Sequence, residues 1–465
     1  MSGLINRLYF AAPVWAQNAL LSAYGVRLRR LRYGRRQRLV LAELRESQWW
    51  PADRIHEMQL AALTALVGHA RKTVPLYATR GLPREPVQLD DRWLAVPLLH
   101  KQELRQSGRG AISTAAPRWR LAEVHTGGTT GTPLTVYCDR ATLQRNYAFF
   151  GRLREWAGVP PGARVATFAG RTVVPAGQAR PPFWRVNAAA NNWLFSSYHI
   201  SAATLPWYVD ALRRVQPELI DSYPSSLEPI ARYLLDRGLG DIRPRTIITS
   251  SETLTSEARA LLERAFGCQV FDHYGGGEMV ALITQCERGA YHVNPEFGLV
   301  ELLRHGRPVA PGETGEIVAT GFINPVMPLI RYATGDWAVW GSEACPCGRA
   351  FPTVAGIEGR RDDVLVTPDG RLIGRLDPIF KKVSSLWETR IIQDRPDHVR
   401  VEVVVTGDGL GPDEEASLTR ELALRLGPAM HIDLVRVPRI PRTQGGKFRA
   451  VINLVAARGE ASAHS

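Results

Sequence analysis

Apolar and polar positions along the chain follow two periods, one helical and one typical of strands. Between residues 4 and 24 apolar side chains recur every three or four positions, which predicts an amphipathic helix. A second helix is predicted over about 53–72, between Pro51 and Pro75. Both belong to a helical N-terminal arm of about residues 1–75.

From about residue 120, short runs of β-forming residues alternate with helical stretches. The expected strands are 164–168, 218–221, 246–249 and 268–271, and the expected helices are 205–216, 225–237 and 255–266. Strand–helix alternation of this kind predicts a layered α/β domain with a largely parallel sheet.

Strand patterns dominate again after residue 298. Strands are expected at 299–303, 316–320 and 337–340, in a smaller sheet or barrel, and later at 389–394, 399–406 and 432–437, with a helix at 413–426. The expected fold class is therefore α/β. A large N-terminal layered α/β domain, residues 1–361, carries an additional β-rich subdomain, and a small C-terminal α+β domain covers residues 362–465.

Composition excludes several classes of protein. The 465 residues are 45% hydrophobic and 22% charged, which is ordinary for a globular protein and excludes disorder and collagen-like repeats. Five cysteines, an odd number, do not make a disulfide framework. No apolar run reaches the roughly 18 residues of a spanning helix, and the N-terminus is a poor secretory signal. We expect a cytoplasmic protein.

The formal net charge of +13 is unevenly distributed. Residues 1–50 contain nine arginines and two glutamates and carry +7 of this charge. This basic part of the N-terminal arm, residues 1–50, could make weak peripheral contact with a membrane or bind another polyanion. The alternative, a solvated arginine-rich face, is better supported, and no nucleic acid partner is expected.

A stretch of glycine and threonine is the most informative motif. Residues 126–133 contain three glycines and four threonines. Glycines allow tight turns with exposed backbone N–H groups, and threonines add hydroxyl donors, so the stretch can cradle phosphate oxygens. It lacks the Gly-Lys-Ser/Thr of a Walker loop. By itself it could also be a hairpin turn, which is the less favoured alternative.

Four further motifs follow in order: Tyr274–Glu278, Arg331–Asp336, Gly359–Asp363 and Pro441–Arg449. Together with 126–133 they resemble the core motifs of adenylate-forming enzymes. That superfamily contains the acyl-CoA synthetases, the adenylation domains of peptide synthetases and the luciferases. The resemblance covers nearly the whole chain and depends on the shared order, because each motif alone is weak.

Further stretches narrow the resemblance to one branch of this superfamily. They are Ser222–Leu227, Ser250–Glu252, Val366–Arg371, Arg375–Lys381 and the N-terminal region from His69 to Tyr77. In these residues the chain is similar to the phenylacetate–CoA ligase-like branch, specifically its capsular-polysaccharide CapK-type members.

The resemblance implies how ATP is held. The residues implied in phosphate binding are Thr126, Gly127, Gly128, Thr129, Thr130 and Gly131. Glu278 is the implied Mg²⁺ ligand, a hard oxygen donor suited to that ion. Tyr274 is expected to line the adenine pocket, with Ser251 and Glu252 nearby. A helix N-terminal position is the structural alternative for Glu278.

The remaining implied site residues lie towards the C-terminus. Asp336 is expected at the ribose hydroxyls and Arg360 at the nucleotide. Lys447, one of five lysines in an arginine-dominated chain, is expected to bridge the substrate carboxylate and the α-phosphate. Asp362 occupies the hinge position, which makes 362–465 a mobile lid. Asp336 could instead be a turn aspartate, and Lys447 a solvated loop lysine.

One position departs from the superfamily pattern. Thr or Ser usually precedes the motif glutamate and helps to bind phosphate, whereas this chain has Gly277. Either water or a backbone N–H substitutes for the hydroxyl, or adenylation is slowed.

Two pairs of metal-ligating residues are separated by a long loop. Cys286 and His292 form one pair, and Cys345 and Cys347 form the other. Three sulfurs and one imidazole suit a structural, tetrahedral Zn²⁺ site, and the resemblance to phenylacetate–CoA ligase-like proteins supports it. The alternative is buried thiols and an ordinary histidine. The other two cysteines, at 138 and 268, are expected in the core.

Two aromatic residues are candidates for the acyl pocket. The resemblance places His199 near a gate between the acyl pocket and the acceptor tunnel, although a satisfied, partly buried histidine is equally plausible. Tyr223, with the region 191–193, is expected to line the pocket itself.

The expected function is ATP-dependent activation of a carboxylic acid as its acyl-adenylate, followed by transfer to a thiol, with CoA as the family default. The expected cofactors are therefore ATP, Mg²⁺, CoA and structural Zn²⁺. The alternative acceptors are an amine, a glycan hydroxyl or a carrier protein. A non-catalytic polyanion-binding protein that retains the fold is the alternative from another class.

Overall fold

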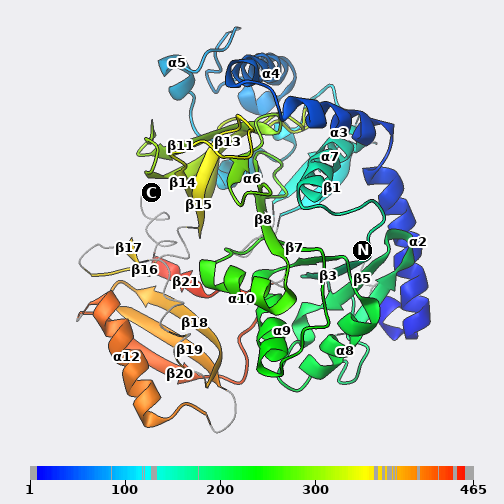
Figure 1. The fold of residues 1–465 in the computed structure, drawn as a ribbon. Helices are drawn as coiled ribbons and strands as arrows, with labels where there is room; N and C mark the ends of the chain where they lie inside the picture. The colour runs from blue at the N-terminus through cyan, green and yellow to red at the C-terminus, as the bar shows by residue number, and fades with distance from the viewer. Residues whose placement is uncertain are drawn as a thin grey trace. The chain divides into compact units, whose positions relative to one another are not determined.

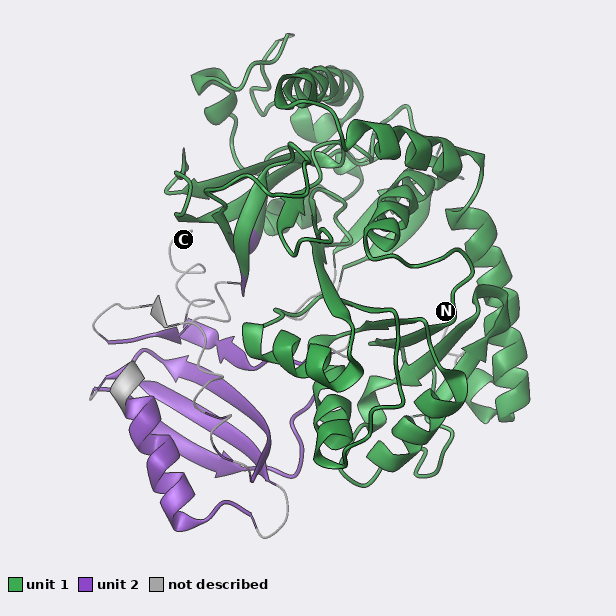
Figure 2. Cartoon of the chain, in the orientation of Figure 1, with its two compact units in different colours: residues 1–334, 338–357 green, residues 335–337, 358–465 purple. Residues whose placement is uncertain are grey.

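The structure is a computed structural model of the chain. It describes residues 8–84, 86–117, 119, 121–126, 134–175, 177–360, 365–368, 372–373, 380, 383, 385–405, 409–427, 429–443 and 448–455. Two compact units make up the chain (Figure 2). The first contains residues 1–334 and 338–357, and the second contains residues 335–337 and 358–465.

Three long helices open the first unit: α2 (Val14–Arg32), α3 (Arg35–Ser47) and α4 (Ala52–Thr73). The helix predicted over 53–72 is confirmed by α4. The helix predicted over 4–24 is confirmed in part: residues 8–11 are helical, the helix is interrupted at residues 12–13, and α2 then continues through Gly25 to Arg32. A side chain at Gly25 would clash with Asn187, so this glycine permits close packing rather than ending the helix.

Strands and helices alternate through the middle of the first unit, as predicted. The strands are β3 (Val165–Ala169), β4 (Trp184–Asn187), β5 (Asn192–Ser196), β6 (Leu219–Ser222), β7 (Thr246–Ser250) and β8 (Gln269–Gly275). The helices are α7 (Arg140–Trp156), α8 (Leu205–Val215), α9 (Pro224–Asp236) and α10 (Ser256–Phe266). Strands β5, β3, β6, β7 and β8 are parallel, and β4 is antiparallel to β5. Helices α8, α9 and α10 lie side by side (Figure 1).

The β-rich region is present, but its strands do not form a separate sheet. They are β9 (Leu282–Gln285), β10 (Tyr291–Val293), β11 (Gly298–Arg304), β12 (Arg307–Pro308), β13 (Thr314–Gly321), β14 (Tyr332–Trp340) and β15 (Thr353–Arg360). The antiparallel pairing of β9 with β8 joins them to one 13-stranded sheet. Its order is β12-β11-β13-β14-β15-β10-β9-β8-β7-β6-β3-β5-β4.

Shorter elements complete the first unit. A separate antiparallel hairpin pairs β1 (Ala122–His125) with β2 (Thr135–Cys138). The short helices are α5 (Asp91–Leu94), α6 (Lys101–Ser107), η1 (Pro75–Tyr77), η2 (Gly108–Ala111), η4 (Ala188–Ala190) and η5 (Ser197–His199).

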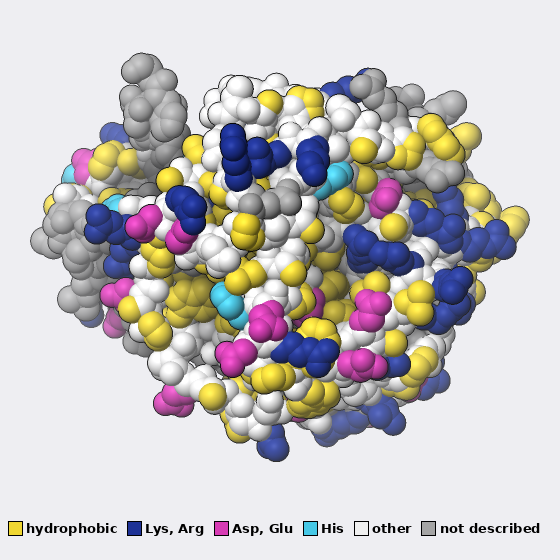
Figure 3. Space-filling model, turned by 90° about the horizontal axis from the view of Figure 1, so that it is seen from above, with side chains coloured by type: hydrophobic (Ala, Val, Ile, Leu, Met, Phe, Trp, Pro, Cys, Tyr) yellow, Lys and Arg dark blue, Asp and Glu magenta, His cyan; other side chains and the backbone are white. Residues whose placement is uncertain are grey.

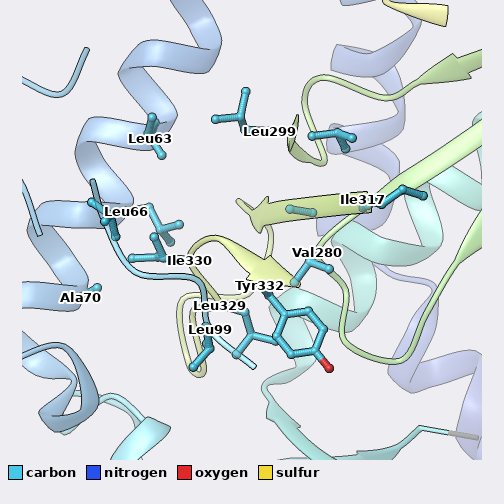
Figure 4. Close-up of a cluster of buried hydrophobic side chains, with 14 of the residues drawn as sticks. Leu63, Leu66, Ala70, Leu99, Val280, Leu299, Ile317, Leu329, Ile330 and Tyr332 are labelled. Carbon is cyan, nitrogen blue, oxygen red and sulfur yellow. The ribbon is translucent and has the colours of Figure 1, made fainter. Parts of the chain in front are cut away.

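The largest core of the first unit lies between α4 and the β-rich half of the sheet. Leu63 and Leu66 of α4 pack in one buried cluster with Leu299, Ile317 and Tyr332 (Figure 4). These positions on α4 recur at helical spacing, so one helix face is buried and the other stays polar. Burial of apolar surface, at about 25 cal/mol per Å², drives this packing.

The second unit is an α+β domain, as predicted. Its four-stranded sheet has the order β20 (His431–Arg436), β19 (His398–Val405), β18 (Leu386–Arg395) and β21 (Val451–Asn453), with α12 (Pro412–Leu426) and a small hairpin, β16 (Leu365–Val366) with β17 (Leu372–Ile373). Val399, Val401 and Val403 alternate along β19 and pack with Leu418 and Leu422 of α12. The α/β fold class is thus confirmed.

The two cysteines outside the Cys/His cluster differ in burial. Cys138 is fully buried in β2 as expected, whereas Cys268 is only half-buried and precedes β8. Gly267 ends α10 in a left-handed conformation, and the turn leaves Cys268 outside the strand.

No helix in the described part of the chain combines the length and apolar character needed to cross a bilayer.

Candidate active site

The carboxyl ends of the parallel strands gather several of the expected site residues. Tyr223 follows β6, Ser251 and Glu252 follow β7, and the turn that contains Glu278 follows β8. Because β6, β7 and β8 are parallel neighbours, these positions lie at one edge of the sheet. Open α/β sheets bind their ligands at this edge.

The turn after β8 meets the base of the Gly/Thr stretch. A Cβ at Gly277 would lie 3.2 Å from Thr126 Cγ2 and 3.3 Å from Val124 Cγ1 of β1. The Glu278 carboxylate folds back over Gly276, where an added Cβ would clash with it. Two motifs far apart in the sequence are therefore direct neighbours, and Gly277 sits where a larger residue would press on Thr126.

Thr126 closes the loop that carries the Gly/Thr stretch. Its backbone N–H donates to Leu134 O at 2.9 Å, and its Oγ1 accepts from Leu134 N–H at 3.2 Å. The residue is buried. Gly127, Gly128, Thr129, Thr130 and Gly131 lie outside the described residues.

Glu278 lies in a turn. Over the described residues 276–281 no helix begins, so the alternative of a helix N-terminal glutamate is wrong. Tyr274, near the end of β8, is half-buried and packs against the main core. It leads directly into the turn, so an aromatic residue and a carboxylate residue lie four positions apart at the end of one strand.

Glu252 holds the start of helix α9. Its carboxylate accepts hydrogen bonds from Ser225 N–H at 3.1 Å and Ser225 Oγ–H at 2.9 Å. A carboxylate at this position satisfies an unpaired helix N–H and is favoured by the helix dipole. Ser251, just before it, has a φ of 69°, a conformation that a residue with a side chain rarely adopts. The loop after β7 is therefore tied to the first turn of α9 by a polar contact.

Tyr223 and His199 are both held in place. Burial raises the pKa of the Tyr223 hydroxyl above its usual range, so the hydroxyl is neutral. His199 Nδ1 lies 2.7 Å from Ser196 Oγ, and Nε2 lies 3.1 Å from Pro175 O. Since a carbonyl only accepts, Nε2 carries the proton and Nδ1 accepts from the serine. The ring also stacks on Phe183, 5.3 Å between centroids. A gate movement of His199 would break these contacts.

A buried carboxyl group in β8, just before the turn, was not selected by the sequence analysis. Asp272 accepts from Thr249 Oγ1–H at 2.6 Å and from Tyr291 O–H at 2.8 Å, and burial raises its pKa to about 6. Burial lowers the pKa of the adjacent His273 to about 4, and its Nδ1 has no hydrogen-bond partner. The available signal was two ionisable residues inside a strand, directly before Tyr274.

Four residues from distant parts of the chain form a compact cluster. The ligand atoms of Cys286, His292, Cys345 and Cys347 all lie within 4.8 Å of one another. Cys286 Sγ is 3.7 Å from Cys345 Sγ, and Cys347 Sγ is 3.4 Å from His292 Nε2. His292 Nδ1 lies 3.4 Å from Phe351 O, an arrangement that leaves Nε2 as the free ligand atom. The donor set and spacing fit one tetrahedral ion.

The other expected site residues lie closer to the C-terminus. Asp336 lies within β14, after Gly335 with a φ of 77°, so the alternative of a turn aspartate is wrong. Arg360 is the last residue of β15. Asp362 and Lys447 lie outside the described residues.

Comparison of the sequence with known proteins finds relatives along the whole chain. A family model for the CapK C-terminal domain matches residues 365–454. Protein CapK of Staphylococcus aureus is 26% identical over 460 residues, which cover 97% of this chain and 99% of the relative. The phenylacetate-coenzyme A ligase of Thermus thermophilus is 24% identical over 453 residues, which cover 88% of this chain and 98% of the relative.

Solved structures share the fold. A 2-hydroxyisobutyryl-CoA ligase in the postadenylation state has a TM-score of 0.69 at 20% identity, covering 90% of this chain and 93% of that one. An anthranilate CoA ligase in complex with anthranoyl-AMP has a TM-score of 0.50 at 15% identity, covering 76% and 69%. The ordered motifs predicted this outcome: along most of its length the chain is similar to CapK and to the phenylacetate-coenzyme A ligases, and it has the fold of the adenylate-forming CoA ligases.

Proposed function

We propose that the chain activates a carboxylic acid with ATP as an acyl-adenylate and passes the acyl group to CoA. The observation that carries the proposal is the meeting of two motifs at the carboxyl edge of the sheet, where Gly277 packs on Thr126 and Glu278 follows. Relatives named phenylacetate-coenzyme A ligase support the acceptor.

The chemistry makes definite demands on this edge. A substrate carboxylate oxygen attacks the α-phosphorus, and pyrophosphate leaves with the electrons of the broken P–O bond. The CoA thiolate then attacks the acyl carbon, and AMP leaves. Negative charge builds on phosphate oxygens in the first step, so cations and backbone N–H donors are required.

We assign the residues as follows. The stretch 126–131 would cradle the phosphates, and Glu278 would hold Mg²⁺, which neutralises phosphate charge when bound. Tyr274 would line the adenine pocket. Ser251 and Glu252 would lie near that pocket, and Glu252 also positions the first turn of α9 through its contact with Ser225. Asp336 and Arg360 would contact the ribose and the nucleotide, and Tyr223 and His199 would border the acyl pocket.

Lys447 is the proposed bridge between the substrate carboxylate and the α-phosphate. In this proposal residues 1–361 bind ATP and the acid, and residues 362–465 form a lid that turns about Asp362 between the two half-reactions. A lysine is suited to this position because its ammonium is a compact point charge that neutralises both anions.

The second part of the proposal concerns the molecule that accepts the acyl group. The C-terminal family match is to CapK, and the CapK relative is the more similar of the two over this chain. The name of that relative specifies no acceptor. An amine, a glycan hydroxyl or a carrier-protein thiol is therefore tested beside CoA.

We further propose that Cys286, His292, Cys345 and Cys347 bind one structural Zn²⁺. Four protein ligands fill a tetrahedral shell and leave no open position for substrate. The ion would connect the β9–β10 hairpin to the segment between β14 and β15.

Acid-dependent ATP–pyrophosphate exchange without CoA tests the first half-reaction. The panel of acids contains aryl acetates, benzoates, fatty acids, hydroxy acids and amino acids. We expect exchange with one class, abolished by Lys447→Ala and retained by Lys72→Ala, which removes an exposed lysine from the end of α4. Unchanged exchange in Lys447→Ala would contradict the assignment.

The second half-reaction separates the acceptors. Lys447→Ala given preformed acyl-adenylate should still form the thioester, because this lysine acts only in adenylation. Pyrophosphate release with no consumption of CoA would point to another acceptor. Equal loss in both half-reactions would overturn the proposed movement of the lid.

A further inference from the structure

Helix α2 turns its apolar side chains outward. Residues 8–26 contain no Asp, Glu, Lys or Arg. The exposed positions in this segment are all apolar or aromatic: Leu8, Ala11, Pro13, Trp15, Ala19, Leu20, Ala23, Tyr24 and Val26. Trp15 is 74% exposed and Leu20 is 53% exposed. A surface helix of a globular protein normally has the reverse pattern, with polar side chains towards solvent.

The polar side chains of α2 are used on its inner side. Asn18 Oδ1 accepts from Val186 N–H at 2.9 Å, and Ser22 Oγ accepts from Ala188 N–H at 3.0 Å. These bonds satisfy backbone groups of β4, the edge strand of the 13-stranded sheet, and of the turn after it. These polar contacts fix the orientation of α2, which lies at the edge of the first unit (Figure 1), and the exposed apolar residues are left on its outer side.

A dense group of arginines follows this apolar face. Residues 27–38 contain seven arginines and no acidic residue. Six are exposed: Arg27, Arg29, Arg30, Arg35, Arg36 and Arg38. The seventh, Arg32, stacks on Tyr147, 4.6 Å from the ring centroid. Figure 3 shows basic and hydrophobic side chains gathered on the side of the molecule where α2 and α3 lie.

We propose that the outward face of α2 and the exposed arginines of residues 27–38 dock on the surface of an anionic lipid bilayer. Trp15 and Leu20 would enter the boundary between headgroups and acyl chains, and the arginines would contact lipid phosphates. A helix of this kind lies in the plane of the membrane rather than crossing it. Juxtaposed basic residues strengthen such binding through the negative surface potential.

Charge favours a bilayer over a second copy of the chain as the occupant. A second copy would bring its own arginines of residues 27–38 towards the same surface. The whole chain also carries +13, so two copies repel each other. An anionic lipid surface matches both halves of the patch, with acyl chains for the apolar face and phosphates for the arginines.

Vesicle co-sedimentation of the full chain tests the proposal. One set of vesicles is phosphatidylcholine alone, and the other is phosphatidylcholine mixed with phosphatidylglycerol. We expect binding to the anionic vesicles that weakens as salt is added, because exposed charges are screened. Binding to phosphatidylcholine alone should be far weaker.

The arginine variant combines Arg27→Gln, Arg29→Gln and Arg30→Gln. Loss of three cations from the surface should weaken binding to anionic vesicles on the order of 100-fold. The matched control combines Arg264→Gln, Arg304→Gln and Arg307→Gln, which removes the same charge from exposed positions elsewhere. This control should retain most of the binding, since global charge acts only weakly at a distance.

The apolar variant combines Trp15→Ala and Leu20→Ala and should weaken binding at least tenfold, since buried apolar area is lost. Its control combines Trp207→Ala and Leu235→Ala, which are 47% and 39% exposed on other helices. ATP–pyrophosphate exchange in solution should be unchanged in every variant, so failure of this proposal is separable from failure of the ligase assignment.

Two outcomes would overturn the proposal. In the first, the chain fails to bind anionic vesicles, or the arginine and apolar variants bind as well as their controls. In the second, light scattering during size-exclusion chromatography shows a dimer that Trp15→Ala and Leu20→Ala dissociate, which would make a second copy the occupant.

Discussion

Replacing one cysteine of the four-residue cluster should release a zinc ion and loosen the first unit. Cys347→Ser keeps the size of the side chain but replaces a thiolate ligand with a hydroxyl that binds Zn²⁺ weakly. Cys347 lies 3.4 Å from His292 Nε2 and belongs to the half-buried pair with Cys345. Cys286 and His292 are fully buried.

The geometry sets the expected stoichiometry. For a tetrahedral ion with Zn–S bonds of about 2.3 Å and Zn–N bonds of about 2.05 Å, two sulfurs lie about 3.8 Å apart and a sulfur and a nitrogen about 3.6 Å apart. The structure has 3.7 Å between Cys286 and Cys345 and 3.4 Å between Cys347 and His292. We therefore expect one zinc per chain.

The expected loss of stability follows from the cross-link that the ion makes. Cys286 and Cys345 are 59 residues apart, and closing a loop of that length costs the unfolded chain entropy worth about 4 kcal/mol at 25 °C. Losing the ion should therefore lower the free energy of unfolding by several kcal/mol. Zinc content is measured by mass spectrometry of the purified protein, and stability by urea unfolding.

Cys268→Ser is the matched control, because this half-buried cysteine lies outside the cluster. It should keep its zinc and most of its stability. The reasoning is refuted if wild-type protein, purified from cells supplied with zinc, holds far less than one zinc ion per chain. It is equally refuted if Cys347→Ser still holds a full ion.

Four further predictions concern single positions in the first unit. Gly277→Thr should slow ATP–pyrophosphate exchange several-fold rather than improve it, since its Cβ would press on Thr126 at 3.2 Å; a faster variant would show that the missing hydroxyl limits the site. As the pH rises from 4 to 7, the free energy of unfolding of Asp272→Asn should increase relative to wild type by up to about 3 kcal/mol. The reason is that the wild-type carboxyl has a folded pKa of about 6, above the unfolded 3.8, so its ionisation destabilises the folded wild-type protein over this range. His273→Gln should show the opposite trend and gain stability relative to wild type at low pH, because the folded pKa of about 4 makes protonation of the wild-type histidine unfavourable. Urea unfolding across this pH range measures both variants. Unfolding free energies that change with pH in the same way as those of wild type would refute both predictions. Arg152→Met should lower the unfolding free energy by about 3–5 kcal/mol, because it removes the cation that pairs with the buried Glu296 carboxylate at 2.7 Å. A loss below about 1 kcal/mol in the same assay would contradict this.

Part of the site was readable from the sequence. The order of the five motifs identified the superfamily without any contact being known. The four residues of the Cys/His cluster were also selected from the sequence as two pairs, because cysteine and histidine are scarce and their spacing is distinctive, and the structure brings their ligand atoms together. The helices α4, α10 and α12 were predicted closely, since each carries a clear apolar period and a proline or polar N-terminal boundary.

Other features became visible only with the tertiary structure. The contact of Gly277 with Thr126 joins a turn to a hairpin that lies far away in the sequence. Glu252 resembled a ligand residue in the sequence, and the structure shows that it also holds the first turn of α9 through Ser225. The shifted pKa values of Asp272 and His273 result from burial under several elements, which no local pattern records.

By itself, the sequence determined where most helices and strands form and which chemistry the motifs favour, because both depend on short-range spacing. Tertiary structure decided what each face meets. Residues 4–24 were predicted as an amphipathic helix, yet α2 places Asn18 and Ser22 against the edge of the sheet and leaves Trp15 outside. The physical reason is that periodicity assigns side chains to faces of an element, whereas unsatisfied backbone groups of a neighbouring strand decide which face turns inward.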